Sequence, residues 1–395
     1  MNILFFLHSF GMGGAERRCA TIANYFVSHG HRVISVLLDS PDVLFKLDKR
    51  VEIVYLPDIE NEVHLNANDT DKIKTVLKSK KNIDRYNLRE KNSLSKEMID
   101  KIIESYSKRI SNFVTKYPDF IVISWVTLYS ISCAVALENL PNKFVIVECN
   151  SPKAEFPEAH YFNSLKRRWY LRSQLAIFQT NEQKEYYDFL TNTEKVVIPN
   201  PVADFGIDRF TGERRKVIVT YSRLKKAKRI PLLIDAFGRF KEEFPDYKLH
   251  IFGNGPEHDL IIEYIKEKKL VNSVVLFDSD VNVHKKVYDC AMFVSASERE
   301  GMSNSMIEAL SIGLPAICTD CYGGGARDII KNGTNGILVP MEDEFALYSA
   351  MKMLATDTAL SDAISENAVK IKDVLSEDTI CLRWLNAIRK VYRNI

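Results

Sequence analysis

The sequence has no marked excess of either charge. Its 395 residues include 54 Lys and Arg against 52 Asp and Glu, which gives a formal net charge of +2. Proteins that bind nucleic acid through their overall charge carry a clear basic excess, so we expect no nucleic-acid partner. Hydrophobic residues make up 46% of the chain and aromatic residues 10%, which excludes an intrinsically disordered protein. The length predicts two domains, each large enough to bury its own core.

Cysteine is sparse, with seven residues scattered along the chain. An odd and scattered set does not build a disulfide framework, so the sequence favours a reducing, cytoplasmic location. Cys318 and Cys321 have no second Cys or His pair at zinc spacing, and we expect both to be structural. Residues 1–14 are apolar but lack a basic leading region and a small-residue cleavage site. They predict a first strand instead of a signal peptide.

The sequence also lacks a convincing transmembrane run. Residues 120–137 carry no charge and approach the roughly 20 residues that cross a bilayer. They nevertheless include four serine or threonine side chains, at Ser124, Thr127, Ser130 and Ser132. A buried strand followed by a short helix accounts better for this pattern, and we expect no membrane span.

Short β-rich runs alternate with helix-length segments along the whole chain, which is typical of a parallel α/β sheet. The predicted strands are residues 2–8, 32–38, 51–56, 120–124, 143–148, 175–180, 195–199, 216–222, 248–253, 273–277, 292–297, 314–319 and 336–340. The pattern begins again near Arg214, so we predict two doubly wound domains. The first is placed at 1–199 and the second at 200–375. A final helix, 376–395, is expected to pack back on the first domain.

A long charged insertion, about residues 58–117, interrupts the first domain. Its second part has apolar residues at helical spacing, namely Ile99, Ile102, Ile103, Tyr106, Ile110 and Phe113. Residues 72–109 include 12 Lys and Arg but only 5 Asp and Glu, a local charge of +7. A second basic cluster surrounds aromatic and apolar residues: Lys166, Arg167, Arg168 and Arg172 around Trp169, Tyr170 and Leu171. Either an anionic partner surface or a merely solvated face fits such charge runs.

Three glycines, Gly11, Gly13 and Gly14, follow the first predicted strand and open a helix. Glycine lets the backbone approach a ligand closely, and the first amides of a helix can bind an anion. A dinucleotide-binding fingerprint would have a third glycine where Glu16 stands, and a carboxylate beside a pyrophosphate is unfavourable. The segment therefore disfavours NAD. A tight turn between strand and helix is the alternative to an anion site.

Two glutamates, Glu300 and Glu308, follow a predicted strand and are separated by seven residues. The loop between them enters a helix that Ser303 or Asn304 can cap. A carboxylate can accept hydrogen bonds from two sugar hydroxyls, and the amides at a helix entry can bind a phosphate. Ligands of open α/β sheets bind at such strand ends, whereas the plainer alternative is a solvated helix face.

Two cations, Arg223 and Lys228, follow the strand predicted at 216–222. Fixed positive charges at this place suit a diphosphate leaving group, whose developing charge needs stabilisation. A basic surface turn is the alternative, because three further basic residues lie in the same stretch.

Taken together, these elements resemble glycosyltransferase family 4, whose members are retaining enzymes of the GT-B fold that use nucleotide sugars. Arg223 and Lys228 stand where the family has its diphosphate-binding cations. Glu300 and Glu308 match its Glu-x7-Glu pair. Other segments also resemble family motifs: the glycine loop 13–16, the interdomain turn Asn200-Pro201, the turn Gly253-Asn254-Gly255-Pro256, and residues 323–328 and 332–336. The resemblance covers essentially the whole chain and is stronger in its second half.

The resemblance implies two Rossmann-like domains that face each other across a cleft, the first binding the acceptor and the second the nucleotide sugar. It implies that Glu300 contacts the donor sugar and that Glu308 contacts the ribose hydroxyls. Arg223 and Lys228 would hold the diphosphate. The other expected donor-binding positions are Gly13, Gly14, Gly253, Gly301, Met302, Ser303 and Asn304.

The sequence departs from the family pattern at four places. Trp125 stands where many members carry a histidine, and residues 148–150 keep the Glu and Asn of a related subset but not its His. We expect Glu148 or backbone groups to take the place of a histidine that contacts the donor or acceptor. Arg229 and Asp278 stand where a glycine is usual.

We therefore expect a retaining transfer of a sugar from a nucleoside diphosphate, by family habit UDP, to a hydroxyl of a glycan or lipid-linked acceptor. Such a reaction serves cell-surface polysaccharide or glycoconjugate synthesis. No Asp-x-Asp pair is assigned a metal-binding role, because Arg223 and Lys228 already stabilise the leaving group; no metal or other cofactor is expected. A nucleotide-sugar epimerase or hydrolase, and a non-catalytic partner subunit of a glycosylation complex, remain alternatives.

The resemblance also bears on the basic segments. Many relatives build polysaccharides on lipid carriers, so we expect residues 72–109 and the cluster around Trp169 to dock on an anionic, lipid-linked acceptor or membrane face. The expected location is cytoplasmic, with peripheral contact at the inner membrane face.

Overall fold

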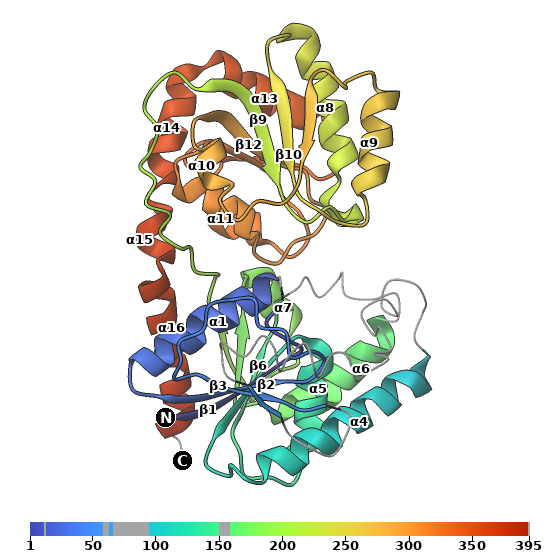
Figure 1. Cartoon of the computed structure of the whole chain (residues 1–395), viewed down its shortest axis with the longest axis vertical. Helices are drawn as coiled ribbons and strands as arrows, with labels where there is room; N and C mark the ends of the chain where they lie inside the picture. The colour runs from blue at the N-terminus through green and yellow to red at the C-terminus, as the bar shows by residue number, and fades with distance from the viewer. Residues whose placement is uncertain (12, 58–62, 66–94, 150–158, 394–395) are drawn as a thin grey trace. The chain divides into compact units, whose positions relative to one another are not determined.

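The computed structural model describes residues 1–393 except 12, 58–62, 66–94 and 150–158. The chain forms two compact units, one of Met1–Pro199 with Ile380–Ile395 and the other of Asn200–Thr379. Each unit is a sheet with helices on its faces (Figure 1). Most of the strongly charged insertion expected at 58–117 lies outside the described residues, but its last helix is described.

The first unit is built on an eight-stranded sheet of order β4-β3-β2-β1-β5-β6-β7-β8. Its strands are β1 (Asn2–Leu7), β2 (Arg32–Leu37), β3 (Glu52–Tyr55), β4 (Val63–Leu65), β5 (Ile121–Trp125), β6 (Phe144–Val147), β7 (Leu175–Phe178) and β8 (Glu194–Val197). All neighbouring pairs run parallel except β3 and β4, which are antiparallel. The central strands are buried along nearly their whole length, as expected for a parallel sheet covered on both faces.

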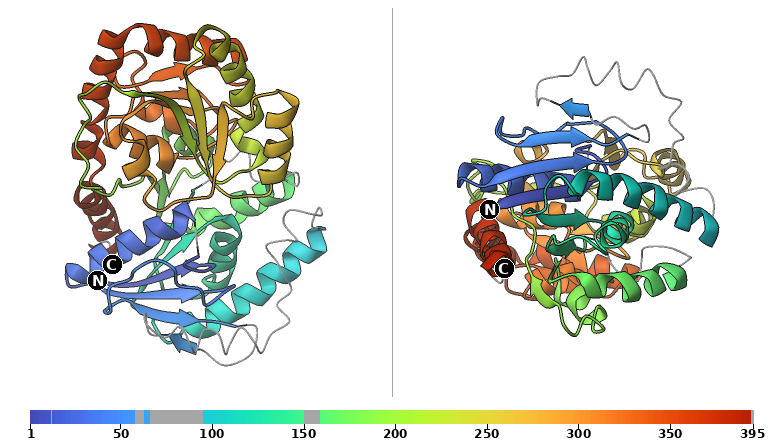
Figure 2. Two further views of the ribbon diagram at one scale, coloured as in Figure 1. Left: turned by 45° about the horizontal axis from the view of Figure 1, so that its top comes forward. Right: turned by 90° about the horizontal axis from the view of Figure 1, so that it is seen from below.

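Helices cover both faces of this sheet (Figures 1 and 2). They are α1 (Gly14–Ser28), α4 (Lys96–Val114), α5 (Thr127–Ala136), α6 (Ala159–Trp169), α7 (Asn181–Tyr186) and α16 (Glu377–Arg393). Side chains alternate across a strand, so Phe6 of β1 packs on Phe113 of α4 while its neighbour Phe5 packs on Phe26 of α1. The apolar stripe predicted for α4 is the buried face of that helix.

The C-terminal helix α16 is fixed to the first unit by an aromatic stack around a buried cation. Trp384 of α16 stacks on Trp125 of β5, with ring centroids 5.3 Å apart. The Arg18 guanidinium of α1 lies over both rings, 4.9 and 5.6 Å from their centroids, and donates a hydrogen bond to Cys149 Sγ at 3.0 Å. Burial lowers the pKa of Arg18, and the ring faces offset part of that desolvation.

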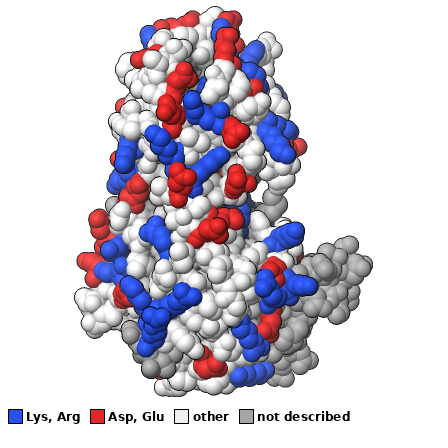
Figure 3. Space-filling model, turned by 90° about the vertical axis from the view of Figure 1, so that its left-hand side faces the viewer, with Lys and Arg blue, Asp and Glu red and all other residues white. Residues whose placement is uncertain are grey.

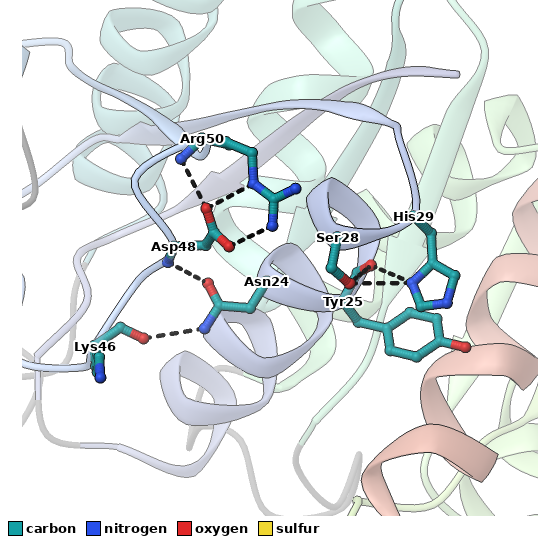
Figure 4. A network of polar contacts seen from close by, with 7 residues as sticks. All are labelled: Asn24, Tyr25, Ser28, His29, Lys46, Asp48 and Arg50. Atoms are coloured by element: carbon teal, nitrogen blue, oxygen red, sulfur yellow. Dashed lines mark hydrogen bonds and ion pairs between the residues drawn. The ribbon is translucent and has the colours of Figure 1, made fainter.

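The loop after β2 is tied to α1 by Asn24 (Figure 4). The Asn24 side chain donates to the Lys46 carbonyl at 3.0 Å and accepts from the Asp48 amide at 2.7 Å. Asp48 in turn accepts hydrogen bonds from Arg50. Earlier in the loop, the Phe10 amide donates to the Asp42 carbonyl at 2.8 Å. The loop is therefore held beside the residues that lead into the glycine turn.

The second unit has a six-stranded parallel sheet of order β11-β10-β9-β12-β13-β14, the doubly wound order of a Rossmann domain. Its strands are β9 (Arg215–Tyr221), β10 (Lys248–Phe252), β11 (Val274–Phe277), β12 (Cys290–Ser295), β13 (Ala316–Thr319) and β14 (Ile337–Val339). Its α-helices are α8 (Ile230–Glu243), α9 (His258–Glu267), α10 (His284–Val287), α11 (Asn304–Ser311), α12 (Gly325–Ile329), α13 (Glu344–Thr356), α14 (Thr358–Ala368) and α15 (Ile371–Leu375). The order reverses between β9 and β12, which is where such sheets bind ligands.

The fold expected from the sequence is confirmed at the level of elements. Every predicted strand is present within a few residues of its expected bounds, and the uncharged run 120–137 forms β5 and the buried helix α5. The short antiparallel strand β4 was not predicted. Across the described ranges, no helix combines the length and the apolar character needed to cross a bilayer.

The basic cluster around Trp169 is smaller on the surface than its sequence indicates. Lys166 is only 2% exposed and donates to the Tyr187 hydroxyl at 2.8 Å, and Tyr170 is fully buried. Arg172 donates to the carbonyls of Glu138 and Leu140. These groups serve the core of the first unit, so the expectation that all four cations form one surface patch is wrong. Charges of both signs are also interspersed over the face shown in Figure 3.

Truncating the α16 anchor should destabilise the first unit. Trp384→Ala removes a fully buried ring and uncovers the Arg18 guanidinium, so we expect a loss of about 3–5 kcal/mol in the free energy of unfolding. Urea unfolding followed by the fluorescence of the two remaining tryptophans, both in this unit, measures the change. Leu382→Ala is the matched control, because Leu382 lies on the same helix and is 46% exposed. Equal unfolding curves for the two variants would contradict the anchoring role.

Candidate functional site

The predicted cations lie where β9 ends. Arg223 follows the last residue of β9 by two positions and is exposed. Lys228 ends the short 3₁₀ turn Lys226–Lys228 before α8. The structure thus places both residues at the carboxyl end of the central strand, beside the point where the strand order reverses. Electropositive groups at this edge can stabilise an anion that binds there.

The position of Arg223 depends on a backbone contact that only glycine permits. A Cβ on Gly253 would lie 1.9 Å from the Ser222 carbonyl oxygen, and its φ of +156° also disfavours other residues. Gly255 makes a similar approach, since a Cβ there would lie 2.2 Å from the Leu224 carbonyl oxygen. The Leu224 amide donates to the Asn254 carbonyl at 2.9 Å. The turn after β10 therefore holds the segment that carries Arg223.

The carboxylate predicted to contact the donor sugar pairs directly with one of the cations. Glu300 forms an ion pair with Lys228, and the two side chains are each 19% exposed. The Ser297 hydroxyl donates to Glu300 Oε1 at 3.2 Å, and the Glu300 amide donates to the Tyr322 carbonyl at 2.9 Å. Ion pair and hydrogen bonds together fix the carboxylate at the mouth of the loop that leads into α11.

The loop 301–304 is held by two contacts from outside it. A Cβ on Gly325 would lie 1.9 Å from the Gly301 carbonyl oxygen, so the glycine-rich turn before α12 packs directly on the loop. The amide of Asn200 donates to the Met302 carbonyl at 3.3 Å and to Asn304 Oδ1 at 2.8 Å. Ser303 is the N-cap of α11. Sequence reasoning identified the loop but gave Asn200 only the role of a turn residue.

The second glutamate is buried inside the unit. Glu308 of α11 is 6% exposed, and its Oε2 lies 3.1 Å from Nε2 of His284, the first residue of α10. The Phe205 ring stacks on the His284 imidazole with centroids 3.6 Å apart. The sequence analysis gave His284 no role, and no local motif marks it. Only the fold brings the two residues together.

Arg229 shows how the chain tolerates the loss of a glycine. It has φ of +50°, in the left-handed region, where glycine is the usual residue. Its guanidinium forms ion pairs with Glu298 and Glu342, and the Glu298 amide donates to the Ala227 carbonyl at 2.9 Å. These contacts offset the strain and join the turn that carries Lys228 to the segment that precedes Glu300.

In the glycine turn of the first unit, the Glu16 carboxylate occupies the space beside Gly13 where another residue would have its Cβ. A Cβ on Gly13 would lie 2.2 Å from Glu16 Oε2, and Glu16 Oε1 lies 2.6 Å from His8 Nε2. Gly13 is the N-cap of α1 and Gly14 its first residue. From the sequence, Glu16 was predicted to make this turn unlike a dinucleotide-binding loop. The structure gives the physical reason, because the Glu16 carboxylate fills the space at the start of α1.

Glu148 lies in the interior of the first unit, at the end of β6. It is 1% exposed, accepts from the Tyr170 hydroxyl at 2.6 Å and lies 3.4 Å from the Thr127 hydroxyl. These hydroxyls would have to move before a substrate could reach the carboxylate. Its expected contact with donor or acceptor therefore stays a prediction.

Cysteines and acidic pairs offer little to a metal ion. Cys318 and Cys321 are each 3% exposed, and burial raises the pKa of both thiols, that of Cys321 to about 12. Asp280, in the pair Asp278-x-Asp280, is paired with Lys286 at 2.5 Å. Within the described part of the chain, no three His, Cys, Asp or Glu side chains gather as a metal-binding group.

Adding a methyl group at Gly253 should loosen the Arg223 segment. We expect Gly253→Ala to lower the free energy of unfolding of the second unit by at least about 3 kcal/mol, from backbone strain and the clash with Ser222. Hydrogen exchange of the Ser222 and Leu224 amides should rise. In the control Gly333→Ala, φ is +74° but nothing lies within 4 Å, so only about 1–2 kcal/mol should be lost. Unchanged exchange at both amides would show that the contact is not needed.

The second unit contains the part of the chain that matches a known protein family. Residues 208–371 match the family model described as Glycosyl transferases group 1. The chain is 30% identical over 238 residues to the N-acetylgalactosamine-N,N'-diacetylbacillosaminyl-diphospho-undecaprenol 4-alpha-N-acetylgalactosaminyltransferase of Campylobacter jejuni, covering 57% of this chain and 64% of that protein. It is 28% identical over 221 residues to the poly(glycerol-phosphate) alpha-glucosyltransferase of Bacillus subtilis, covering 55% of this chain and 32% of that protein. The chain thus spans less than two thirds of the length of these relatives.

A solved structure agrees with the whole fold. The pneumococcal O-GlcNAc transferase GtfA, solved with UDP and GlcNAc, superposes with a TM-score of 0.72 at 16% sequence identity, covering 99% of each chain. At that identity the likeness concerns the fold. The chain therefore has the two Rossmann-like units of the GT-B fold, and residues 208–371, which carry both cations and both glutamates, match the family model of group 1 glycosyl transferases.

Proposed function

We propose that this protein is a retaining glycosyltransferase of family 4 that moves a sugar from a nucleoside diphosphate, UDP above all, to an acceptor hydroxyl. The observation that carries the proposal is the Lys228–Glu300 ion pair at the carboxyl end of the second sheet, inside the segment that matches group 1 glycosyl transferases. A cation for the leaving diphosphate and a carboxylate for the sugar are there fixed side by side.

The leaving group is the first chemical demand of this reaction. Breaking the bond between the anomeric carbon and the diphosphate places negative charge on the phosphate oxygens. Arg223 and Lys228 would stabilise that charge in the transition state, where preorganised donors are worth most. The amides of residues 301–304, held by Asn200 and Gly325, would bind phosphate and sugar without further rearrangement.

The two glutamates would bind the parts of the donor other than the diphosphate, namely the sugar and the ribose. Glu300 would orient the sugar hydroxyls, because it stands beside the cation that holds the diphosphate. Glu308 would bind the ribose hydroxyls from inside α11. Gly13 and Gly14, in the first unit, are proposed as further donor contacts. For the donor to approach Gly13, the Glu16 carboxylate that fills this space would first have to move away.

The acceptor is proposed to be a glycan or a lipid-linked saccharide of cell-surface polymer synthesis. The Campylobacter relative is named for a substrate linked to diphospho-undecaprenol. The Bacillus relative is named for a poly(glycerol-phosphate) substrate. Both are anionic acceptors that carry a hydroxyl to be glycosylated. The sugar and the linkage are to be found by experiment.

A donor screen followed by product analysis tests the activity. UDP and UDP-sugars should raise the melting temperature of the chain, and the best donor should be consumed with transfer to a lipid-linked or soluble acceptor. Free, isomerised or hydrolysed sugar without an acceptor would instead identify an epimerase or hydrolase. A chain that binds no nucleotide would correspond to a non-catalytic partner subunit.

The cations should matter for turnover far more than their neighbours. We expect Arg223→Ala and Lys228→Ala each to lower turnover by roughly 10²–10³, the usual loss for one preorganised donor. Lys226→Ala is the matched control, because Lys226 is exposed in the same turn and is given no role. Steady-state rates at saturating donor measure the effect. Near wild-type turnover in both cation variants would remove the diphosphate assignment.

Metal independence is proposed for the same reason. Where two cations already stabilise the leaving group, a divalent ion is not required for that step. We expect full activity after treatment with EDTA and no gain on addition of Mn²⁺ or Mg²⁺. Activity that disappears with chelator and returns with metal would refute this part of the proposal.

We also propose a cytoplasmic location with peripheral, electrostatic contact between the first unit and an anionic membrane or acceptor. The support is the local charge of +7 over residues 72–109, of which 72–94 lie outside the described residues. The described part contributes little, since residues 95–109 hold four basic and three acidic side chains. Of the cluster around Trp169, only Arg167 and Arg168 are exposed cations.

Vesicle sedimentation tests the membrane contact. The protein should sediment with anionic but not neutral vesicles, and the binding should be lost in high salt because screening limits the field to about 8–10 Å near physiological ionic strength. Neutralising the lysines between 72 and 81 should weaken binding more than Arg167→Gln with Arg168→Gln, which serves as the control. Full activity on a soluble acceptor with no vesicle binding would leave the basic segment as solvated surface.

A further inference from the structure

The pair formed by His284 and Glu308 is a buried polar contact that neither the sequence motifs nor the comparisons assign. Both side chains are 7% exposed, and His284 Nε2 lies 3.1 Å from Glu308 Oε2. A buried carboxylate is costly unless it is hydrogen-bonded, and this contact holds one oxygen, Oε2, of the Glu308 carboxylate.

The imidazole is itself held on both sides. Phe205 stacks flat on it, with ring planes inclined by 16° and centroids 3.6 Å apart. Tyr221, at the end of β9, presents its ring at 84° and 6.1 Å, and its hydroxyl donates to the Ser305 carbonyl of α11 at 3.0 Å. The ring plane of His284 is therefore set by Phe205, which precedes β9 in the chain, and by Tyr221, the last residue of β9.

Such an arrangement fixes a binding group more precisely than α11 alone could. A glutamate side chain has three rotatable bonds, and a helix position does not determine the direction of its oxygens. A neighbour that holds one oxygen leaves the carboxylate preorganised for hydroxyl groups that arrive from the ligand, which is how supporting residues sharpen a binding site.

We propose that His284 is a positioning residue that fixes the Glu308 carboxylate for the ribose, and so sets the preference of the site for ribonucleotides over deoxyribonucleotides. This inference rests on the proposed function and deepens it, because it assigns a specificity determinant to the nucleotide site. A carboxylate of fixed direction binds two vicinal hydroxyls together, whereas a mobile one loses part of that advantage to rotamer entropy. The competing explanation is that the pair only ties α10 to α11.

Affinity for UDP compared with 2′,3′-dideoxyuridine diphosphate separates the two explanations. By calorimetry, the wild-type chain should prefer UDP by about 100-fold or more, as expected for charge-assisted hydrogen bonds to two hydroxyls. His284→Leu should reduce this preference to about 10-fold or less, while leaving binding of the dideoxy compound nearly unchanged. His284→Gln, which places an amide near the imidazole Nε2, should restore most of the preference. His250→Leu, a half-buried histidine of the same unit outside this site, is the matched control.

A double-mutant cycle shows whether His284 acts through Glu308. In the Glu308→Ala background, His284→Leu should cause no further loss of the preference, because the group that it positions is gone. Separate, additive losses, or a His284→Leu variant that is less stable but keeps the wild-type preference, would overturn the inference and leave a purely structural pair. A wild-type chain that binds no nucleoside diphosphate in the donor screen would refute the proposed function itself, which keeps the two failures distinct.

Discussion

Close backbone contacts that only glycine permits align the loops of the second unit's site. The turn at Gly253 packs on the Ser222 carbonyl, and the turn at Gly325 packs on the Gly301 carbonyl. Parallel strands end at one edge of a sheet, so the loops after β9, β10, β12 and β13 are neighbours from the start. The glycine contacts then bring the loops after β9 and β10, and those after β12 and β13, into direct backbone contact. Arg223 and Glu300 are exposed or half-buried residues on loops, and the glycine contacts act together with the Ser297 and Lys228 contacts that hold the Glu300 carboxylate.

The sequence was informative where local pattern decides the structure. Runs of β-branched residues and the apolar stripe of α4 depend on neighbours in the chain, and both predictions are confirmed. Strand β4 was missed because three residues carry too little periodicity to be distinguished from a loop. The motif residues of the second unit could be proposed from the sequence for the same reason: they lie in short segments with characteristic spacing, next to strand ends.

The sequence was uninformative where distant residues determine the role of a side chain. Lys166 looked like surface charge because it precedes two arginines, but the fold turns its ammonium towards the Tyr187 hydroxyl inside the core. Asn200 and His284 lie 104 and 24 residues from the groups they contact, Asn304 and Glu308, and no spacing rule connects such positions. Charge and polarity can be counted from a sequence, but whether a polar group faces water or a partner is decided by tertiary packing.

The Lys228–Glu300 ion pair has a consequence for the order of events at the proposed donor site. With its ammonium on Glu300, Lys228 offers an arriving diphosphate little net positive charge, and Arg229 is engaged by Glu298 and Glu342. The proposed diphosphate site also includes Arg223, whose side chain is exposed, and the amides of the 301–304 loop. Phosphate oxygens that approached Lys228 would compete with Glu300 for the same ammonium, because both are anionic partners of one cation. The carboxylate released from Lys228 stays tethered to Ser297 and can turn to the hydroxyls of the sugar. In the proposed reaction, binding of the diphosphate and recognition of the sugar would therefore be coupled through one lysine, and a nucleotide that lacks the diphosphate would not prepare the site for its sugar.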